Sequence, residues 1–426
     1  MPKLSSRLVA ALPLILLVAA PLRAEDWPQW RGPNRDGVWT EAGILETFPA
    51  EGLKVRWRVP VGPGWSSPVV AHGRVYLTDS QLMPPKGKER VQCFDEATGK
   101  SLWTHSYDVS YPDWAFTEKP GRGPTATPIV HEGMAYTVGN KGDLLCLDAL
   151  KGEVLWKRNL ETKYQVQEFA FNASPLIEGD LLVVCIGSYP ASQASTVIAL
   201  DKNTGKEIWK APNEGLTNSS PIVVTAGGKR QLIVWTQGSV TSLDPTTGKT
   251  YWQERMKTAA QDAVTTPVFH NHRLLISGLM LMLDADKPAA SILWPDTKAV
   301  PRRTLSITST ALFRGDHLFS AKSSGLLVCV DARTGKQVWE TDKVTTLGNG
   351  ACIHLTPNGE GVFLHTDKGE LIRAQLTAQD FRESSRTLLL KPVAKAKAWA
   401  APAYANRHVF VRNDEEIICV SLAAKQ

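Results

Sequence analysis

The sequence predicts an all-β protein, a single eight-bladed β-propeller of four-stranded blades. Three observations support this prediction. An Asp-x-x-x-Gly-x-x-x-Trp unit recurs, a pair of small residues before a proline starts one strand of each repeat, and a lone N-terminal strand complements an incomplete last repeat. Four-stranded units that recur about every 40–60 residues are typical of propeller blades.

The Asp-Gly-Trp unit predicts a β-hairpin followed by a strand with a buried Trp. An Asp side chain can bond the backbone of the next turn, and glycine adopts a left-handed conformation that a Cβ opposes. Five copies share one spacing: Asp95–Trp103, Asp148–Trp156, Asp201–Trp209, Asp244–Trp252 and Asp331–Trp339. A sixth copy, Asp284–Trp294, has two extra residues and no glycine. The Trp residues predicted to dock blades together are Trp57, Trp103, Trp156, Trp209, Trp252, Trp294 and Trp339.

The small-small-Pro marker predicts where each blade begins. Proline is tolerated at the first residue of a strand, where its missing N–H costs little. The six clear markers are Ser66–Pro68, Ala126–Pro128, Ala173–Pro175, Ser219–Pro221, Thr265–Pro267 and Ala400–Pro402. Two weaker ones, Ser309–Ala311 and Gly350–Cys352, bring the number of blade starts to eight.

The last repeat lacks a Trp-strand, and residues 53–58 supply one. After Ala400 the chain has two apolar strands and then reaches Gln426, whereas Leu53–Arg58 precedes the first marker. Pairing these segments completes the eighth blade and removes the open edges of the ring. The predicted organisation is a signal peptide over 1–24, an N-terminal cover segment over 25–52 and the propeller over 53–426.

Residues 1–24 are interpreted as an export signal, with a retained N-terminal anchor as the alternative. Lys3 and Arg7 precede an apolar run from Leu8 to Ala20, which is short for a membrane span. No Cys follows the expected cleavage point, so a lipid anchor is not expected. The protein is predicted to be periplasmic or secreted, monomeric, and without a transmembrane segment after cleavage.

Charge and cysteine usage narrow the partners further. The first 24 residues hold three of the 48 Lys and Arg and no acid, so the remainder is nearly balanced against 42 Asp and Glu. Nucleic acid is therefore not an expected partner. Most cysteines lie in apolar, strand-like runs, which predicts buried free thiols, although an exported chain could form disulfides. The six are Cys93, Cys146, Cys185, Cys329, Cys352 and Cys419.

These repeats resemble the pyrroloquinoline-quinone-like (PQQ-like) propeller repeat of the quinoprotein alcohol dehydrogenase-like superfamily, over residues 53–422. The one-domain layout is similar to the BamB-type scaffold of outer-membrane protein assembly. The opening segment Asp26–Gly37 resembles that of exported PQQ-like proteins of planctomycete-type bacteria. The resemblance implies a propeller whose blades dock through Trp. The chain lacks the adjacent Cys pair of the dehydrogenases, a recognisable calcium-binding trio and the lipidated Cys of the scaffold.

The candidate binding site is one mouth of the central channel. The residues three positions before the proline of each marker enter the innermost strands, and they are polar apart from two Trp and a Val. Arg122, Asp262 and Asn349 lie close by in the same loops. Aromatic faces with a few polar groups at a concave mouth can bind a ligand or peptide. The alternative is that these residues only solvate or plug the channel. The candidate residues are Trp65, Arg122, Asn172, Asn218, Asp262, Thr308, Asn349 and Trp399.

Three further segments depart from the repeat. Gln81–Arg90 and Tyr107–Gly123 are insertions in the first blade, which we interpret either as a contact surface or lid, or as loops packed on their own blade. The N-terminal segment 25–52 contains Trp27, Trp30 and Trp39, which need burial, so it is expected to pack across the propeller.

The leading hypothesis is an exported, non-catalytic binding or scaffold protein of the bacterial cell envelope. Its partners would be envelope proteins, or a small-molecule or carbohydrate ligand at the mouth. One alternative is a PQQ- and calcium-dependent dehydrogenase that oxidises alcohols or sugars, although no ligands for PQQ or calcium are identifiable. The second alternative is recognition or processing of polysaccharide. No metal site is predicted, because His270 and His272 lack a further ligand at suitable spacing.

Overall fold

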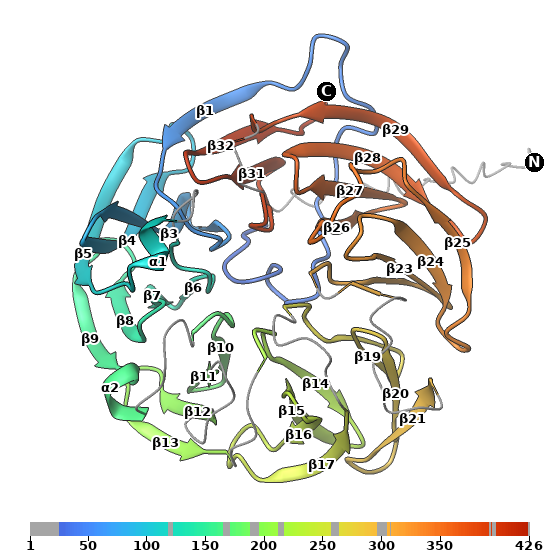
Figure 1. The fold of residues 1–426 in the computed structure, drawn as a ribbon, viewed down its shortest axis with the longest axis horizontal. Helices are drawn as coiled ribbons and strands as arrows, with labels where there is room; N and C mark the ends of the chain where they lie inside the picture. Colours follow the sequence, from blue (N-terminus) through green and yellow to red (C-terminus); the bar gives the residue numbers. More distant parts are fainter. Residues whose placement is uncertain are drawn as a thin grey trace, which may run out of the picture.

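The protein is a ring of eight four-stranded antiparallel sheets around a central axis (Figure 1). The computed structural model describes residues 25–117, 122–164, 171–187, 196–211, 217–256, 264–295, 305–306, 308–391, 393 and 398–424. Within these ranges two short helices, α1 (Trp114–Thr117) and α2 (Leu160–Tyr164), accompany the strands. The predicted eight-bladed propeller is therefore confirmed.

Each blade runs from an innermost to an outermost strand in chain order, except in the last blade. Blade 1 contains β2 (Val69–Ala71), β3 (Arg74–Met83), β4 (Lys86–Asp95) and β5 (Ser101–Val109). Blade 2 contains β6 (Ile129–His131), β7 (Met134–Val138), β8 (Asp143–Asp148) and β9 (Val154–Asn159). Blades 3 and 4 contain β10 (Leu176–Glu178), β11 (Leu181–Ile186), β12 (Thr196–Asp201), β13 (Glu207–Lys210), and β14 (Ile222–Ala226), β15 (Lys229–Trp235), β16 (Ser239–Leu243), β17 (Thr250–Arg255).

The second half of the ring repeats this order. Blades 5 and 6 contain β18 (Val268–His270), β19 (Arg273–Ile276), β20 (Leu279–Leu283), β21 (Ala290–Trp294), and β22 (Leu312–Arg314), β23 (His317–Ala321), β24 (Leu327–Asp331), β25 (Gln337–Thr341). Blade 7 contains β26 (Ile353–Asn358), β27 (Gly361–Thr366), β28 (Glu370–Leu376) and β29 (Phe381–Leu388). Blade 8 contains β30 (Ala403–Ala405), β31 (His408–Arg412) and β32 (Glu416–Ser421), with β1 (Val55–Pro60) as its outermost strand.

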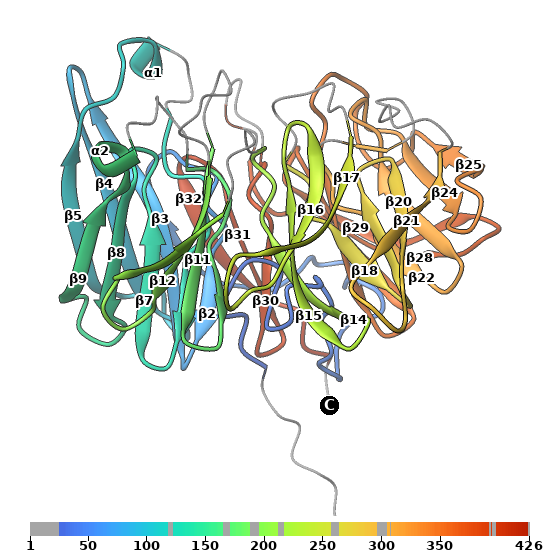
Figure 2. The same cartoon turned by 90° about the horizontal axis from the view of Figure 1, so that it is seen from below.

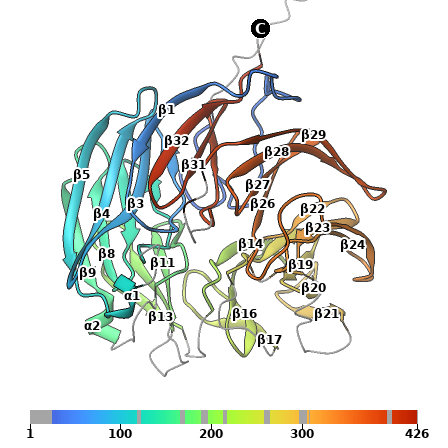
Figure 3. The same cartoon turned by 45° about the horizontal axis from the view of Figure 1, so that its top comes forward.

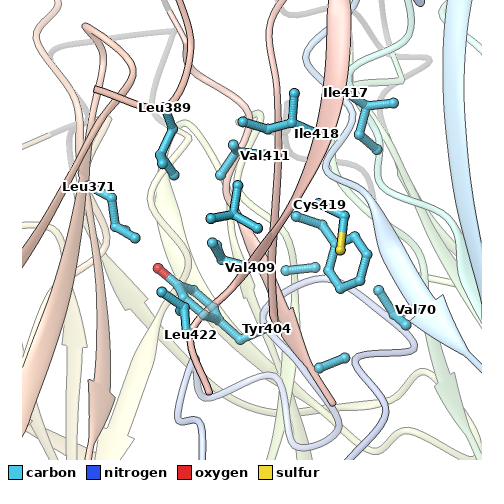
Figure 4. Packing of buried hydrophobic residues seen from close by; sticks show 14 of the residues in the cluster. Val70, Leu371, Leu389, Tyr404, Val409, Val411, Ile417, Ile418, Cys419 and Leu422 are labelled. Atoms are coloured by element: carbon cyan, nitrogen blue, oxygen red, sulfur yellow. The ribbon is translucent and has the colours of Figure 1, made fainter. Parts of the chain in front are cut away.

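The ring closes through β1, which pairs antiparallel with β32 (Figure 3). The closing strand predicted over 53–58 is thus observed over Val55–Pro60. The largest apolar cluster gathers at this closure and includes Tyr404, Val411 and Cys419 of blade 8 (Figure 4). All six cysteines are free and buried, which confirms the prediction for them.

The Asp-Gly turns have the expected local structure. In the blade 3 turn, the Asp201 carboxylate accepts hydrogen bonds from the N–H groups of Asn203 (3.0 Å) and Thr204 (2.8 Å). Gly205 then adopts the left-handed conformation, with φ of 65°. The Asp side chain therefore stabilises the turn, and glycine avoids the strain that a Cβ would bring there.

The same glycine also makes room for the Trp of the preceding blade. A Cβ on Gly205 would lie 2.7 Å from Cε3 of Trp156, and the Trp156 indole N–H donates to the carbonyl oxygen of Lys202 (3.0 Å). Equivalent indole bonds to the next blade join Trp57 to Glu96, Trp103 to Ala149, Trp209 to Pro245, Trp294 to Ala332 and Trp339 to Thr377. The Asp-Gly-Trp unit thus joins one blade to the next.

Trp252 is arranged differently. Its indole N–H donates to Gln231 Oε1 (2.8 Å) within its own blade, and its side chain is half-buried. The turn that faces it in blade 5, Asp284–Pro288, has no glycine. Trp252 therefore does not make the indole hydrogen bond to the next blade that the other six Trp residues make.

The small residues before each proline link the innermost strands around the axis. The hydroxyl of one blade's marker accepts the backbone N–H of the preceding blade's marker at four junctions. These bonds are Ser67 N to Thr127 Oγ1 (3.1 Å), Thr127 N to Ser174 Oγ (3.0 Å), Ser174 N to Ser220 Oγ (2.9 Å) and Thr266 N to Thr310 Oγ1 (3.1 Å). Serine and threonine at these positions therefore satisfy backbone donors that the narrow centre of the ring buries.

The N-terminal segment packs on one face of the ring and into its centre, where it contacts most of the blades (Figure 2). Trp27 and Trp39 are buried, as expected, and Trp30 is half-buried. The segment forms hydrogen bonds with seven of the eight blades. In the order of blades 1, 2, 3, 4, 5, 7 and 8, the bonded pairs are Trp27 with Val70, Pro28 with Val130, Arg35 with Pro175, Arg35 with Pro221, Trp30 with Thr266, Trp39 with Pro357, and Glu41 with Asn406.

Candidate functional site: the channel mouth

The predicted mouth lies on the face opposite the N-terminal segment. Its residues precede the innermost strands, at the end of the blades that also carries α1 and α2 (Figure 2). The N-terminal segment instead reaches the turns at the other end of the inner strands, where Glu41 accepts the backbone N–H of Asn406 and of Arg407. One end of the axis is therefore covered, and the other end presents the candidate residues.

Trp65 and Trp399 meet across the junction between blades 8 and 1. Their ring centroids are 4.9 Å apart at an interplanar angle of 62°, an edge-to-face contact. The Arg122 guanidinium carbon lies 4.9 Å from the Trp65 centroid, in a cation–π arrangement. The Trp399 indole N–H donates to Gly350 O (3.1 Å), which fixes its ring. All three side chains are half-buried, so part of this aromatic-cation cluster is accessible to solvent.

The polar positions continue around the mouth as a hydrogen-bonded row. Thr125 Oγ1 donates to Asn172 Oδ1 (2.6 Å), and Asn172 Nδ2 donates to Asn218 Oδ1 (3.0 Å). Thr308 Oγ1 donates to the carbonyl oxygen of Ala351 (2.8 Å). The residues three positions before the marker prolines of blades 2, 3 and 4 are therefore joined by hydrogen bonds from each blade to the next.

The remaining two candidates are Asn349 and Asp262. Asn349 is exposed and directly precedes Gly350, whose carbonyl holds the Trp399 indole. Asp262 lies outside the described residues.

The insertion that carries Arg122 is anchored on its own blade and on blade 2. The hydroxyl of Ser80 donates to Arg122 O (2.9 Å), and Asn140 Nδ2 donates to Gly123 O (2.6 Å). Tyr111 is buried and donates its hydroxyl proton to Glu89 (2.5 Å). The described residues of this insertion thus pack on the propeller itself, on blade 1 and on the neighbouring blade 2.

Glu89 is the buried centre of that anchor, and sequence reasoning missed it. Its carboxylate accepts hydrogen bonds from the hydroxyls of Tyr107 (2.6 Å) and Tyr111 and from the backbone N–H of Asn140 (3.1 Å). Burial raises the pKa of Glu89, and these donors oppose the shift. No sequence pattern around Glu89, in the insertion Gln81–Arg90, predicts this role. Only the folded blade brings the two tyrosines to its carboxylate.

Two arginines from the N-terminal segment, the buried Arg35 and the half-buried Arg31, approach the axis from the covered end. Arg35 donates to the carbonyl oxygens of Pro175 (2.8 Å) and Pro221 (3.1 Å), and burial lowers its pKa to about 9. Burial likewise lowers the pKa of Arg31 to about 10. A cavity of about 20 Å³ between Arg31, His354 and Thr310 is large enough for one water.

The chain matches the protein family described as "Outer membrane protein assembly factor BamB" over residues 87–294 and 282–387. The chain belongs to this family. Among relatives, the outer membrane protein assembly factor BamB of Shewanella oneidensis is 23% identical over 328 residues, which cover 75% of this chain and 67% of the relative. The quinoprotein ethanol dehydrogenase of Pseudomonas aeruginosa is 26% identical over 208 residues, 45% of this chain and 30% of the enzyme. The chain thus spans less than a third of that enzyme.

Solved structures agree on the fold. BamB from Moraxella catarrhalis matches with a TM-score of 0.61 at 16% identity, covering 88% of this chain and 99% of that one. The quinohemoprotein alcohol dehydrogenase from Comamonas testosteroni matches with a TM-score of 0.68 at 14% identity, covering 94% of this chain and 81% of the enzyme. At such identities the likeness shows the propeller fold that the BamB family shares with these enzymes, and fold alone does not assign chemistry.

The described residues do not fit the PQQ and calcium that the dehydrogenase resemblance implies. Calcium takes about 6–8 oxygen ligands, and the described part of the chain has no group of three or more His, Cys, Asp or Glu placed to hold a metal. Trp65 and Trp399 meet edge to face and offer no parallel slot for a flat quinone. No helix within the described ranges is long and apolar enough to cross a membrane.

Proposed function

We propose that this member of the BamB family is a non-catalytic scaffold of the bacterial cell envelope that supports outer-membrane protein assembly. The observation that carries the proposal is the family match, which extends through seven of the eight blades. Export to the periplasm is part of the proposal, and it is supported by the apolar N-terminal run Leu8–Ala20. The monomeric state and a carbohydrate ligand stay predictions from the sequence.

We further propose that partners contact the channel mouth. The opposite end is covered by the N-terminal segment, whereas Trp65, Trp399 and Arg122 stay half-buried. Tryptophan and arginine are the residues most enriched at the energetic centres of protein interfaces. The row from Thr125 to Asn218 supplies polar groups beside them.

A gene deletion in the organism that carries the chain tests the scaffold proposal. We expect the deletion to lower the amount of folded outer-membrane barrel proteins, measured by the mobility difference between folded and unfolded barrels on gels. Wild type should restore them. The Trp65→Ala/Trp399→Ala double variant and Arg122→Ala should restore them poorly, because they remove the exposed anchors. Leu155→Ser, at an exposed apolar residue of β9, is the matched control. Normal barrel levels in the deletion strain would overturn the proposal.

A quinone-dependent dehydrogenase is the second candidate, favoured by relatives such as the ethanol dehydrogenase named above. Adding PQQ and calcium to the purified chain and recording quinone absorbance and dye-linked alcohol oxidation tests it. We expect neither signal, because the described residues do not supply the calcium ligands. Stoichiometric PQQ binding with substrate turnover would instead establish the enzyme.

A further inference from the structure

The β3–β4 hairpin of blade 1 extends beyond the strand that covers its inner edge. β3 has ten residues, whereas β2 pairs only with Arg74–Tyr76. Further along, Arg412 Nη1 donates to Thr78 O (3.2 Å). Ser80 N then donates to Pro63 O (3.0 Å). Loop and side-chain groups therefore cover the edge of β3 as far as Ser80.

Leu82 carries the next backbone groups on this edge. Met83 pairs with Lys86 across the two-residue turn Pro84–Pro85, so the backbone groups of Met83 face β4. Alternation along an antiparallel ladder turns the N–H and C=O of Leu82 the other way, as it does those of Ser80. Within the described ranges no strand pairs with Leu82 on that side. An edge of this kind is a template for one more strand.

An apolar groove of about 680 Å³ lies beside this edge. One wall is β3, with Leu82 and Met83, and the other is the link between β1 and β2, with Val61; Phe116 of α1 also lines it. Met83 is 62% exposed, which makes it the most exposed large apolar side chain in the described part of the chain. The groove therefore offers pockets for apolar side chains next to unpaired backbone groups.

Two exposed lysines lie on the hairpin beside the groove. Arg90 is the single charged residue among the described lining residues, and its Nε donates to the buried carboxylate of Asp79 (2.8 Å). Lys86 and Lys88 are exposed on the hairpin. The ion pair of Lys88 with Asp108, at 3.7 Å and largely exposed on both sides, is weak. An acidic group beside the hairpin tip would therefore be attracted.

We propose that this edge and groove bind an extended segment of a protein partner. The segment adds a strand to β3 at Leu82, places alternate apolar side chains in the groove beside Met83, and brings an acidic residue to Lys86 and Lys88. Backbone bonds give such an added strand its affinity, and the pockets for alternate side chains give its specificity. The inference rests on the proposed binding role and locates a second contact surface away from the mouth cluster.

A peptide selection on the full chain tests this proposal. Random peptides of about 12 residues, long enough to add one strand, are selected on the wild type and counter-selected on Met83→Glu. We expect enriched peptides with alternating apolar residues and an Asp or Glu at one end. Met83→Glu should weaken their binding about tenfold or more, as loss of an interface anchor does. Leu155→Glu, at a 53% exposed residue of β9, is the control and should leave binding unchanged.

Methylating single peptide amides distinguishes strand addition from simple apolar capture. Because only every second amide of an added strand faces β3, we expect binding to fall at alternate positions. Uniform tolerance of methylation, enrichment of basic peptides, or binding insensitive to Met83→Glu would overturn the proposal. So would a dimer in solution that Met83→Glu dissociates, since a second copy would then occupy the groove. None of these outcomes depends on the barrel levels of the deletion strain, so the two proposals fail separately.

Discussion

The absence of a Cβ at Gly205 has two structural roles in the repeat. Its φ of 65° favours a residue without a Cβ, and its Cα hydrogen faces the ring of Trp156. The sequence pattern predicts the first role, because a turn between two strands needs a left-handed residue. The second role depends on how neighbouring blades pack, which spacing along one blade does not contain.

A matched pair of glycines separates these two roles. Gly179 has nearly the same φ, 60°, but a Cβ there would meet no atom within 4 Å. We expect Gly179→Ala to lower the free energy of unfolding by roughly 1–2 kcal/mol, the cost of a left-handed residue. Gly205→Ala should lower it by about 1–3 kcal/mol more, because the Trp156 ring must move. Urea unfolding measures both, and equal losses would show that the ring gives way freely.

The turn aspartates make stability depend on pH. The Arg333 side chain is the largest cause that lowers the pKa of Asp331 to about 2, and the Thr98 hydroxyl similarly lowers that of Asp95. The folded pKa lies below the unfolded value of about 3.9, so this stabilisation is complete above about pH 4 and is lost as the pH falls toward 2.

Asp331→Asn tests this pH dependence, because Asn keeps an oxygen acceptor but cannot ionise. We expect the variant to be less stable than wild type at pH 7 and to lose less stability between pH 5 and about 2. Urea midpoints across this range give the measurement, with Asp342→Asn, at an exposed aspartate outside these turns, as the control. Parallel curves for wild type and Asp331→Asn would contradict the assignment.

Among the blades, the junction between blades 4 and 5 differs from its neighbours. Trp209 is 8% exposed, donates to Pro245 O (3.0 Å) and lies on Gly248 of the next blade. Trp252 stays half-buried and bonds Gln231 in its own blade. The facing turn of blade 5 has no glycine, but this alone does not explain the difference, because Trp339 bonds Thr377 O in blade 7, where the turn also lacks glycine.

Two substitutions compare these junctions. Trp209→Ala should destabilise the protein by about 3–5 kcal/mol, the usual effect of truncating a buried Trp. Trp252→Ala should cost distinctly less, because less of its ring is buried and no indole hydrogen bond to the next blade is lost. Thermal or urea unfolding of both variants provides the comparison. Equal effects would mean that the blade 4 junction depends on Trp252 as strongly as the others depend on their Trp.

At this scale the sequence determines much of the fold and less of the site. The spacing of Asp, Gly and Trp is local, so it predicts each hairpin, and the eight markers predict the blade number. The pairing of Trp65 with Trp399 follows from ring closure, because their blades become neighbours. The anchoring of Arg122 through Glu89 could not be predicted, since it depends on contacts between the insertion and blade 2 that show no periodicity.

For the whole molecule, the N-terminal segment links several blades around the ring, including blades 1 and 4, which are not neighbours. The backbone N–H of Val70 in blade 1 bonds Trp27 O (2.9 Å), and that of Val130 in blade 2 bonds Pro28 O (2.9 Å). Arg35 reaches blades 3 and 4 through Pro175 and Pro221. The segment thus covers one end of the inner strands and satisfies donors that have no ladder partner.

Removing residues 25–41 tests this role. We expect a lower unfolding temperature and faster hydrogen exchange at the amides of Val70 and Val130, whose acceptors are deleted. The amide of Leu77, inside the β3–β4 ladder, should exchange as in the full chain and serves as the internal control. Unchanged exchange at Val70 and Val130 would show that the strands hold these donors without the segment.

Blade 8 combines the two ends of the chain, since Val55 of β1 lies opposite Val420 of β32. During synthesis the first seven blades can form in order, but the eighth waits until β32 (Glu416–Ser421) has emerged. Until then β1 and the face of blade 1 beside it are open, and the growing chain exposes apolar surface at both ends. Completion is therefore a single late event of very high sequence separation, which is expected to be the slow step of folding. A ribosome that stops before β32 would release an open ring.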